Sequence, residues 1–344
     1  MLKLPLELVQ RLTPFYAGRR VCVTGGAGFI GGHLIDALLA LQARVNVIDD
    51  LSNSDGEHIG ELVEFDPARL TFIHGSLLDD VSMKDAVKGC DIVFHLAAMG
   101  SVPMSIELPQ RSFSVNATGT VRVLEHARAA SARRVVYSAS SSAYGEGPEG
   151  ATASVAPRVE SQTPMPLSPY AAGKLAGEHA MTAWSRSFGI STISLRYFNV
   201  FGPRQPADSA YAAVIAAFTK ALLSGKPPVI FGDGRQSRDF TPVASAVAAN
   251  LLAGASTKEL TGQVVNIGTG KRTDLIELAT LIAQRCAAPG VRPEFRPGRP
   301  GDVRHSLADI SAAKALLGYE PIGTLETALD STIAWYREQV ATTA

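Results

Sequence analysis

Near the beginning of the chain lies Thr24-Gly25-Gly26-Ala27-Gly28-Phe29-Ile30-Gly31, which follows a β-branched run and precedes an apolar helical pattern. Glycines between a strand and a helix let the chain turn tightly and bring backbone amides and a helix N-terminus to one point. The next strand pattern ends in Asp49, at the distance expected for a carboxylate that binds adenosine ribose hydroxyls. The two features predict a dinucleotide site. The carboxylate favours NAD over NADP, with Arg44 and His33 keeping NADP open.

From Arg20 onward, short β-branched runs alternate with longer helical patterns. This alternation is typical of a parallel sheet with helices on both faces. We therefore predict an α/β fold, a Rossmann-like doubly wound parallel sheet that binds ligands beyond the carboxyl ends of its strands. The expected strands are Val21 to Thr24, Val45 to Asp49, Leu70 to His74, Ile92 to Ala97, Val135 to Ser140 and Thr192 to Tyr197, with helices such as His33 to Leu41 and Thr118 to Ala130.

The pattern changes after Phe198, where proline and glycine become frequent between helices. Such a composition indicates a smaller, loop-rich C-terminal substrate domain laid over the sheet edge. Residues 262–270 look like a strand that returns to the first domain, so the two domains are expected to interleave. We predict an N-terminal helical extension at 1–19, an NAD-binding domain at 20–197 with a return near 240–270, and a mainly substrate-binding part at 198–344.

The bulk composition excludes several classes of function. In a chain of 344 residues, 32 basic side chains balance 32 acidic ones, so no overall field would recruit nucleic acid or an anionic membrane. No apolar run approaches the roughly 18 residues that a membrane-spanning helix needs. The 3 cysteines are widely spaced and odd in number, which argues against a disulfide framework or a metal site and fits a reducing, cytoplasmic compartment.

A candidate for the chemistry is Ser168-Pro169-Tyr170-Ala171-Ala172-Gly173-Lys174. Residues four apart on a helix share one face, so Tyr170 and Lys174 are expected to lie together. An ammonium close to a phenol favours the phenolate, which turns the hydroxyl into a proton acceptor near neutral pH. This spacing also occurs by chance on solvated helices, so its meaning depends on the surrounding motifs.

A cluster of hydroxyl groups, Ser138 to Tyr144, ends the fifth expected strand. With the glycine loop and the Tyr170 and Lys174 pair, it resembles the extended short-chain dehydrogenase/reductases, specifically their nucleotide-sugar 4-epimerase branch. The resemblance makes Ser140, Tyr170 and Lys174 the catalytic triad. The dehydratases and decarboxylases of this superfamily carry acids after the catalytic Ser/Thr, where this chain has Ser141 and Ser142, so elimination and decarboxylation lose support.

The resemblance also implies the residues that bind NAD. Ser76 stands where many members have an aspartate for the adenine amino group, so the backbone of Leu77 is an alternative contact. Asn116, at the start of a helical pattern, is expected to steady the backbone near the active site or to serve as a helix cap. The predicted cofactor contacts are Gly25, Gly28, Phe29, Ile30, Gly31, Asp49, Ser76, Leu77, Leu96, Ala97, Ala98, Asn116, Tyr170, Lys174 and Tyr197.

The resemblance further implies a UDP-sugar site, in which loop arginines grip the diphosphate. Ser306 occupies a gatekeeper position that is bulky in enzymes restricted to unsubstituted hexoses, and its small size leaves room for an acetamido group at C2. A small residue in a loop is the simpler alternative. The predicted substrate contacts are Ser101, Ser140, Ser141, Ser142, Tyr170, Asn199, Arg238, Arg299, Asp302 and Ser306.

Together these motifs favour a reversible, NAD-dependent C4 epimerisation of UDP-N-acetylglucosamine and UDP-N-acetylgalactosamine through a 4-keto intermediate. One alternative is a UDP-glucuronate or UDP-N-acetylglucosaminuronate 4-epimerase, with Arg204 or His305 as the cation near C6. A second is a non-catalytic NAD-bound scaffold on the same fold. The resemblance also implies a homodimer through the helix that carries Tyr170 and the one before it, and the apolar Ala176, Val121 and Val123 are compatible with that interface.

Overall fold

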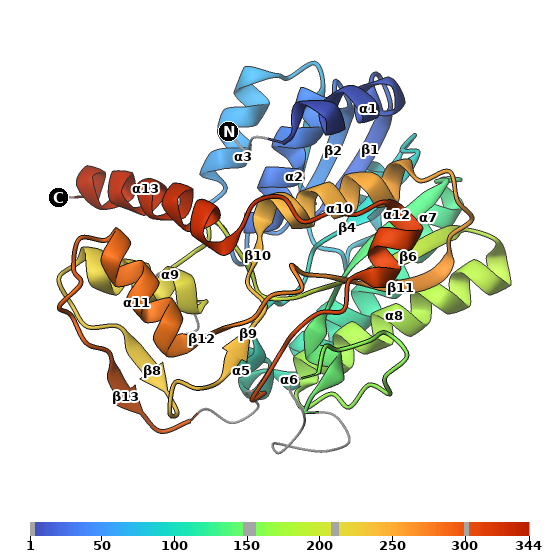
Figure 1. The fold of residues 1–344 in the computed structure, drawn as a ribbon. Helices are drawn as coiled ribbons and strands as arrows, with labels where there is room; N and C mark the ends of the chain where they lie inside the picture. Colours follow the sequence, from blue (N-terminus) through green and yellow to red (C-terminus); the bar gives the residue numbers. More distant parts are fainter. Residues whose placement is uncertain (1–3, 147–155, 208–212, 299–302, 344) are drawn as a thin grey trace.

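A computed structural model describes residues 4–146, 156–207, 213–298 and 303–343. Its centre is a seven-stranded sheet in the order β11-β6-β5-β4-β1-β2-β3 (Figure 1), and every neighbouring pair runs parallel. The strand order reverses between β1 and β4, which is where such sheets form their ligand crevice. The strands are β1 Arg20–Thr24, β2 Arg44–Asp49, β3 Leu70–His74, β4 Ile92–His95, β5 Arg134–Ser140, β6 Ser191–Tyr197 and β11 Thr261–Ile267.

Helices cover both faces of this sheet because the strands are apolar on both sides. One face packs against α1, α2, α3, α10 and α12, and the other against α4, α7 and α8, each with its own apolar core. The predicted fold class is therefore confirmed. These helices are α1 Leu6–Tyr16, α2 Phe29–Ala40, α3 Glu57–Phe65, α4 Asp80–Val87, α7 Gly119–Ala129, α8 Pro169–Phe188, α10 Val243–Ala255 and α12 Ser311–Leu317.

The end of β4 differs from the expected strand Ile92 to Ala97, because β4 stops at His95. There the backbone N–H of Leu96 donates to the carbonyl oxygen of Thr24 at 3.1 Å. The next N–H, of Ala97, donates to the Thr24 side chain, Oγ1, at 3.2 Å. These bonds turn the chain across the end of β1, so Leu96 and Ala97 lie at the crevice rather than inside the sheet.

A second lobe, at the lower left of Figure 1, has its own apolar core formed by α9, α11, α13 and β8. Short strand pairs, β7 with β10, β9 with β12 and β8 with β13, build and join this lobe. Its elements are β7 Val200–Phe201, α9 Val214–Leu223, β8 Val229–Phe231, β9 Ser237–Arg238, β10 Thr241–Pro242, β12 Thr273–Asp274, α11 Leu275–Arg285, β13 Glu294–Arg296 and α13 Leu325–Thr343. Between these elements the chain returns to the large sheet through α10 and β11, so the lobes interleave.

The N-terminal helix α1 is part of the first core. The Tyr16 ring is fully buried, and its hydroxyl donates to the carbonyl oxygen of Leu251 in α10 at 2.7 Å. The guanidinium of Arg19 lies 4.4 Å from the centre of the Phe15 ring, a distance at which the cation is attracted to the ring face. Helix α1 therefore closes one side of the molecule.

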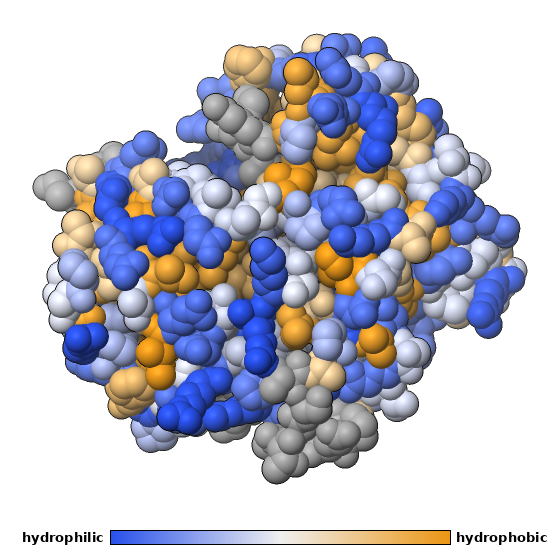
Figure 2. All heavy atoms as spheres, in the orientation of Figure 1, coloured by the Kyte–Doolittle hydropathy of each residue, from blue (hydrophilic) through white to orange (hydrophobic). Residues whose placement is uncertain are grey.

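Polar and apolar residues are mixed over the face shown in Figure 2, which agrees with the balanced charge of the chain. Across the ranges that the structure describes, none of the helices combines the length and the apolar character required to cross a bilayer.

Candidate active site

The glycine loop after β1 lies against the backbone that follows β4. Gly25 has φ of +71°, and a Cβ built on it would lie 2.6 Å from the Cα and N of Ala97. A Cβ on Gly31 would lie 2.2 Å from the carbonyl oxygen of Gly25. No side chain fits at either position. Gly28 caps α2, so the N-terminus of this helix faces the loop. This cradle fits the pyrophosphate of a dinucleotide.

Asp49 ends β2 beside this loop. Its Oδ2 accepts from the N–H of Ala27 at 3.0 Å, and its Oδ1 accepts from that of Leu51 at 2.9 Å. Burial raises the pKa of Asp49, and the two backbone hydrogen bonds oppose that rise. Each carboxylate oxygen has two lone pairs, so both keep acceptor capacity for ribose hydroxyls. The residues present thus fit NAD.

Arg44 and His33, the two residues that left NADP as a possible cofactor, do not face the ribose site at Asp49. Arg44 begins β2, whereas Asp49 ends it. The Arg44 guanidinium therefore lies at the opposite edge of the sheet from Asp49. His33 is buried in α2, where its Nε2 lies 2.9 Å from the carbonyl oxygen of Pro203. Burial, with Arg204 nearby, lowers the pKa of His33 to about 4. Neither residue offers a charge for a 2′-phosphate at neutral pH.

Ser76 and Leu77 follow β3 at the same edge. The Ser76 hydroxyl accepts from the N–H of Leu78 at 3.2 Å, so it forms a local turn. The Leu77 side chain is buried in the core, where its Cδ1 would lie 3.2 Å from a Cβ built on Gly119. The side chains of both residues are therefore engaged in structure, and their backbone remains as the candidate cofactor contact.

Asn116 does not begin a helix. It lies inside a π-helical turn, Ser114–Thr118, between α6 (Pro109–Phe113) and α7. Its Oδ1 accepts from the N–H of Met99 at 2.9 Å, and its Nδ2 donates to the Met99 carbonyl at 3.3 Å. The expected helix cap is therefore wrong, because the wider turn aims the amide at a neighbouring loop. Asn116 fixes the backbone that continues from Leu96, Ala97 and Ala98.

Sequence reasoning missed a buried chain of hydrogen bonds beneath this loop. The Nδ1 of His95 lies 2.8 Å from Thr24 Oγ1, and its Nε2 lies 3.0 Å from Thr120 Oγ1. Thr120 in turn donates to the carbonyl of Asn116 at 2.7 Å. Burial, with the Lys174 charge, lowers the pKa of His95 to about 3, so it is neutral. The available signal was a histidine at the end of an otherwise apolar strand.

The residues of the predicted triad lie on β5 and α8, near the carboxyl end of β5. Ser168 caps α8 by accepting from the N–H of Ala171 at 3.2 Å, which places Tyr170 in the first turn and Lys174 one turn later. Ser140 ends β5, and its hydroxyl lies close enough to Tyr170 to lower the pKa of that phenol. Burial raises the pKa of Tyr170, and the bond with Ser140 lowers it. The structure thus places Ser140 beside Tyr170, and Lys174 one helical turn from Tyr170 on α8, and their joint catalytic role stays a prediction.

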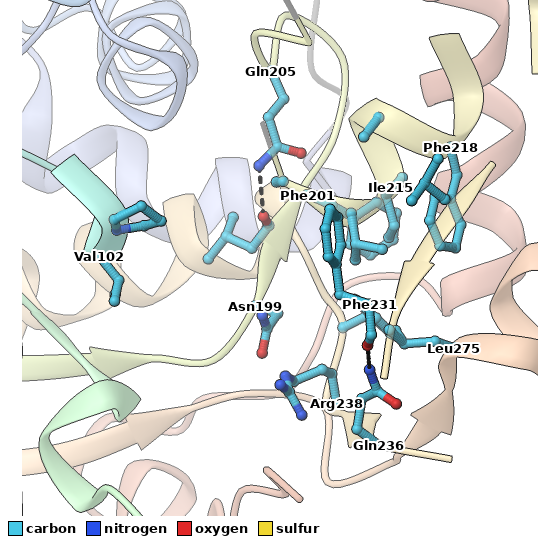
Figure 3. Close-up of a pocket in the computed structure, with 17 residues that line it drawn as sticks. Val102, Asn199, Phe201, Gln205, Ile215, Phe218, Phe231, Gln236, Arg238 and Leu275 are labelled. Atoms are coloured by element: carbon cyan, nitrogen blue, oxygen red, sulfur yellow. Dashed lines mark hydrogen bonds between the residues drawn. The ribbon is translucent and has the colours of Figure 1, made fainter. Parts of the chain in front are cut away.

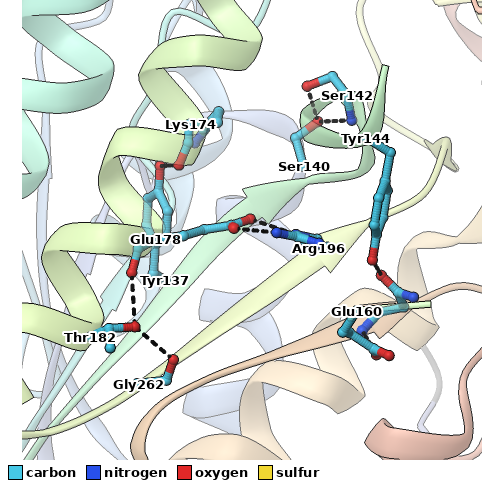
Figure 4. A network of polar contacts seen from close by, with 11 residues as sticks. Tyr137, Ser140, Ser142, Tyr144, Glu160, Lys174, Glu178, Thr182, Arg196 and Gly262 are labelled. Carbon is cyan, nitrogen blue, oxygen red and sulfur yellow. Dashed lines mark hydrogen bonds and ion pairs between the residues drawn. The ribbon is translucent and has the colours of Figure 1, made fainter. Parts of the chain in front are cut away.

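Lys174 is buried above the β5 strand. Its Nζ donates to the carbonyl oxygen of Ser138 at 2.8 Å and lies 4.9 Å from the centre of the Tyr137 ring. Burial lowers the pKa of Lys174 to about 7, and the carboxylate of Glu178 opposes this. Glu178 itself is paired with Arg196 through bonds of 2.6 and 2.8 Å (Figure 4). The ammonium is therefore held in a fixed position by buried neighbours.

Tyr197 belongs to the core rather than to an open surface. Its ring is buried, its hydroxyl lies 3.0 Å from Ser138 Oγ, and Asn250 Nδ2 donates to it at 2.5 Å. Ser138 also provides the carbonyl that holds Lys174. Tyr197 thus contacts the residue that holds Lys174. Its direct contact with the cofactor stays a prediction.

A cavity of about 280 Å³ lies between the two lobes (Figure 3). Phe201, Ile215 and Phe218 line one side, whereas Asn199 and Arg238 lie on the other. An apolar slot with a cation at its edge suits a flat base attached to phosphates.

Two glutamines in this cavity were not predicted. Gln205 and Gln236 each donate from Nε2 to a backbone carbonyl, Gln205 to Val200 at 3.0 Å and Gln236 to Phe231 at 2.5 Å. Their Oε1 atoms have no hydrogen-bond partner within the described ranges, so each can accept an N–H from a ligand. Only their nearness in the chain to Arg204 and Arg238 could have indicated these two glutamines.

The segment that contains Ser306 lies alongside β9. The N–H of Ser306 donates to the carbonyl oxygen of Ser237 at 3.0 Å. Asp239, fully buried next to Arg238, accepts from the N–H groups of Thr269 at 2.8 Å, Gly270 at 2.9 Å and Ala308 at 3.3 Å. This carboxylate ties the gatekeeper segment to the strand of Arg238.

The remaining predicted substrate contacts do not line the cavity between the lobes or lie outside the described residues. Ser101 caps α5 (Val102–Glu107) by accepting from the N–H of Met104 at 3.2 Å, and Val102 lines the cavity. Ser141 and Ser142 belong to the 3-10 turn Ser141–Tyr144 after β5. Arg299 and Asp302 lie outside the described residues. No cluster of three or more His, Cys, Asp or Glu side chains suited to a metal occurs within the described ranges.

Residues 21–268 match the model of the NAD dependent epimerase/dehydratase family. The chain belongs to this family. It is 38% identical over 322 residues to the UDP-glucose 4-epimerase of Mycolicibacterium smegmatis, which covers 93% of this chain and 99% of that protein. It is 31% identical to the UDP-glucuronate 4-epimerase of Thermodesulfobacterium geofontis, over 92% of this chain and 96% of the relative.

Solved structures agree with this assignment. The UDP-N-acetylglucosamine 4-epimerase of Methanobrevibacter ruminantium, in complex with UDP-N-acetylmuramic acid, has a TM-score of 0.85 at 37% identity, over 94% of this chain and 99% of that one. The UDP-glucuronic acid 4-epimerase of Bacillus cereus, with UDP-glucuronic acid and NAD, has a TM-score of 0.84 at 30% identity, over 93% and 99%. These matches confirm the predicted family, the NAD cofactor and the type of enzyme. The relatives carry different sugars, so the sugar does not follow from membership.

The glycine cradle gives the first prediction. Replacing Gly25 by Ala adds a Cβ that must push the loop away from Ala97. A left-handed φ also costs a non-glycine residue roughly 1–2 kcal/mol. We expect the dissociation constant for NAD, measured by calorimetry, to rise about tenfold, since that equals about 1.4 kcal/mol.

The matched control is Gly60→Ala in α3, where the added Cβ meets no atom within 4 Å. It should leave NAD affinity unchanged. Equal affinities for the Gly25→Ala variant and the unmodified protein would show that the cradle does not hold the cofactor.

Proposed function

We propose that the chain, an NAD-dependent UDP-sugar 4-epimerase, interconverts UDP-N-acetylglucosamine and UDP-N-acetylgalactosamine. The observation that supports the chemistry is the placement of Ser140 next to Tyr170, with Lys174 one turn further along α8, at the same edge of the sheet as the glycine cradle. A tyrosine that can accept a proton, next to a site for a hydride acceptor, is suited to reversible oxidation of a secondary alcohol. The cavity between the lobes supports a nucleotide as the substrate's handle.

In this mechanism each residue has a defined task. Tyr170, as phenolate, removes the proton from the 4-hydroxyl group, and Ser140 is its hydrogen-bonding partner. Lys174, fixed by the Ser138 carbonyl, supplies the buried positive charge. When bound, NAD supplies a reversible hydride acceptor for C4. Arg238 holds the diphosphate while the 4-keto sugar turns over, so that the second face of C4 is presented.

The acetamido group is assigned from the residue at the gatekeeper position. Ser306 is only 7% exposed, and its backbone is bonded to β9, so its side chain occupies a fixed place near Arg238. A small side chain there leaves space that a bulky one would fill. The likeness to the Methanobrevibacter ruminantium enzyme supports the same choice.

A uronate is the second candidate, favoured by positive charge near the same segment. His305 bonds through Nδ1 to Ser237 Oγ at 2.9 Å. Burial, followed by the charges of Arg304, Arg272 and Arg238, lowers the pKa of His305, so the positive charge near this segment comes from the arginines. Among the two cations predicted for C6, Arg204 is bound instead to Asp36 at 2.7 Å and to His33 at 2.6 Å. Arg204 therefore serves the fold, not the sugar.

The function is tested by incubating the purified protein with UDP-N-acetylglucosamine, UDP-glucose and UDP-glucuronate and following the C4 epimers by NMR. We expect the first to be turned over fastest. The variant Tyr170→Phe should lose roughly 10²–10⁴-fold in kcat because it has no group to accept the proton. It should still bind NAD. Fastest turnover of UDP-glucuronate would select the uronate, and NADH accumulation without epimerisation would indicate a net oxidoreductase.

The gatekeeper assignment has its own test. We expect Ser306→Tyr to reduce kcat/KM for UDP-N-acetylglucosamine by roughly tenfold or more relative to UDP-glucose, because the ring fills the space beside C2. The control Ser311→Tyr places the same ring on an exposed residue of α12 and should change neither value. An equal loss on both sugars would remove the gatekeeper role.

We also propose a homodimer through α7 and α8. These two helices pack side by side on one face of the sheet, and the neighbouring Phe113 and Phe188 are 47% and 52% exposed. Val121 and Ala176 are partly exposed and remain compatible with the interface. Val123 is fully buried in the core, so its predicted part in the interface is wrong: its side of α7 faces the sheet.

Analytical ultracentrifugation checks the dimer. The unmodified protein should sediment as a dimer, and Ala176→Arg should shift it toward monomer, because a buried unpaired charge at an interface is costly. Ala68→Arg, at an exposed loop position, should stay dimeric. A monomeric unmodified protein would contradict the proposal.

A further inference from the structure

The hydroxyl of Ser140 receives two hydrogen bonds from one residue. Ser142 donates to Ser140 Oγ from its backbone N–H at 3.2 Å and from its own Oγ at 2.8 Å (Figure 4). A serine hydroxyl has one proton and two lone pairs. Both lone pairs of Ser140 are thus occupied by Ser142.

Because both lone pairs are occupied, the Ser140 hydroxyl has only its proton available for a further hydrogen bond. Toward any third neighbour, Ser140 can act only as a donor, and Tyr170 is the neighbour whose pKa the Ser140 hydroxyl lowers. A donated proton stabilises a phenolate, whereas a neutral phenol that donates to Ser140 would find no free lone pair. We propose that Ser142 is a positioning residue whose hydroxyl commits the proton of Ser140 to Tyr170 and thereby favours the phenolate form.

The hydroxyl of Ser142 is not needed for the turn itself. Ser140 caps the 3-10 turn through the backbone N–H of Ser142, which any non-proline residue would supply. The side-chain bond at 2.8 Å is additional and is the shorter of the two. Its direction, toward Ser140, also differs from the predicted role of Ser142 as a contact to the sugar.

The inference rests on the proposed function for its consequence in the reaction. The proton of the 4-hydroxyl passes directly to the oxygen of Tyr170, and the proton of Ser140 stays on Ser140. Once Tyr170 is protonated, Ser140 can turn its donor to the new carbonyl oxygen at C4. Ser140 is thus a hydrogen-bond donor throughout and does not relay the proton.

The test is a titration of Tyr170 that does not depend on turnover. Ultraviolet difference spectra of the NAD-bound protein, without sugar, report phenolate formation, with Tyr170→Phe in each background as the reference. We expect Ser142→Ala, which keeps the N–H, to move this titration upward by about one pH unit. Ser142→Thr, which keeps the hydroxyl, should restore it. The ascending limb of the kcat profile should move in parallel, with KM for UDP-N-acetylglucosamine nearly unchanged.

The outcomes of this titration distinguish a positioning role of Ser142 from the alternatives. The same titration in Ser142→Ala and in the unmodified protein would overturn the proposal, and a raised KM with that titration would make Ser142 a sugar contact. A shift that Ser142→Thr fails to restore would also count against it, because the shift would then reflect altered packing. If the titration moves as expected but the unmodified protein epimerises no UDP-sugar, the proposed function fails and the role of Ser142 stands.

Discussion

The molecule depends on one steric constraint, the contact between the backbone at Gly25 and the backbone at Ala97. Because β1 and β4 are neighbours, the segment after β1 and the segment after β4 pass close to each other. Only a glycine in a left-handed conformation permits this close approach at position 25. That contact sets the floor of the crevice at the reversal of the strand order. Asp49 then lies on the β2 side and Ser140 on the β5 side, so cofactor and reaction groups share one edge.

The sequence was sufficient for the features that depend on local pattern. The period of the strands and the glycine loop predicted β1 to β3 with almost correct bounds, and the spacing of Tyr170 and Lys174 placed them on one helical face. Features set by distant contacts were not accessible. Helical periodicity showed that Val123 is apolar, but not that the sheet, rather than a partner, covers it. The π-helical turn at Asn116 likewise brings its amide to Met99, 17 residues earlier in the chain, a contact that no local pattern indicates.

Buried charge beneath the triad explains why these side chains can be held so firmly. Lys174 and Glu178 on α8 and Arg196 on β6 are all buried. The Glu178 carboxylate is paired with Arg196, and its charge also opposes the lowering of the Lys174 pKa. Removing such charges from water is costly unless each is paired and hydrogen-bonded. Short bonds from Arg196 to Glu178 and a backbone carbonyl for Lys174 offset that cost, although Nη1 of Arg196 has no hydrogen-bond partner within the described ranges. The geometry is thereby restricted to one arrangement.

Asp239 has a consequence for how substrate range can change over evolution. Its buried carboxylate binds the strand of Arg238, the turn at Thr269 and the segment of Ser306 through Ala308 into one rigid piece. In the proposed function, a substitution at Ser306 would therefore alter the volume beside the sugar while Asp239 keeps Arg238 in place. The proposed contact to the nucleotide and the proposed choice of sugar thus belong to different residues of one rigid piece, so a single replacement at Ser306 would exchange the sugar and leave the nucleotide contact unchanged.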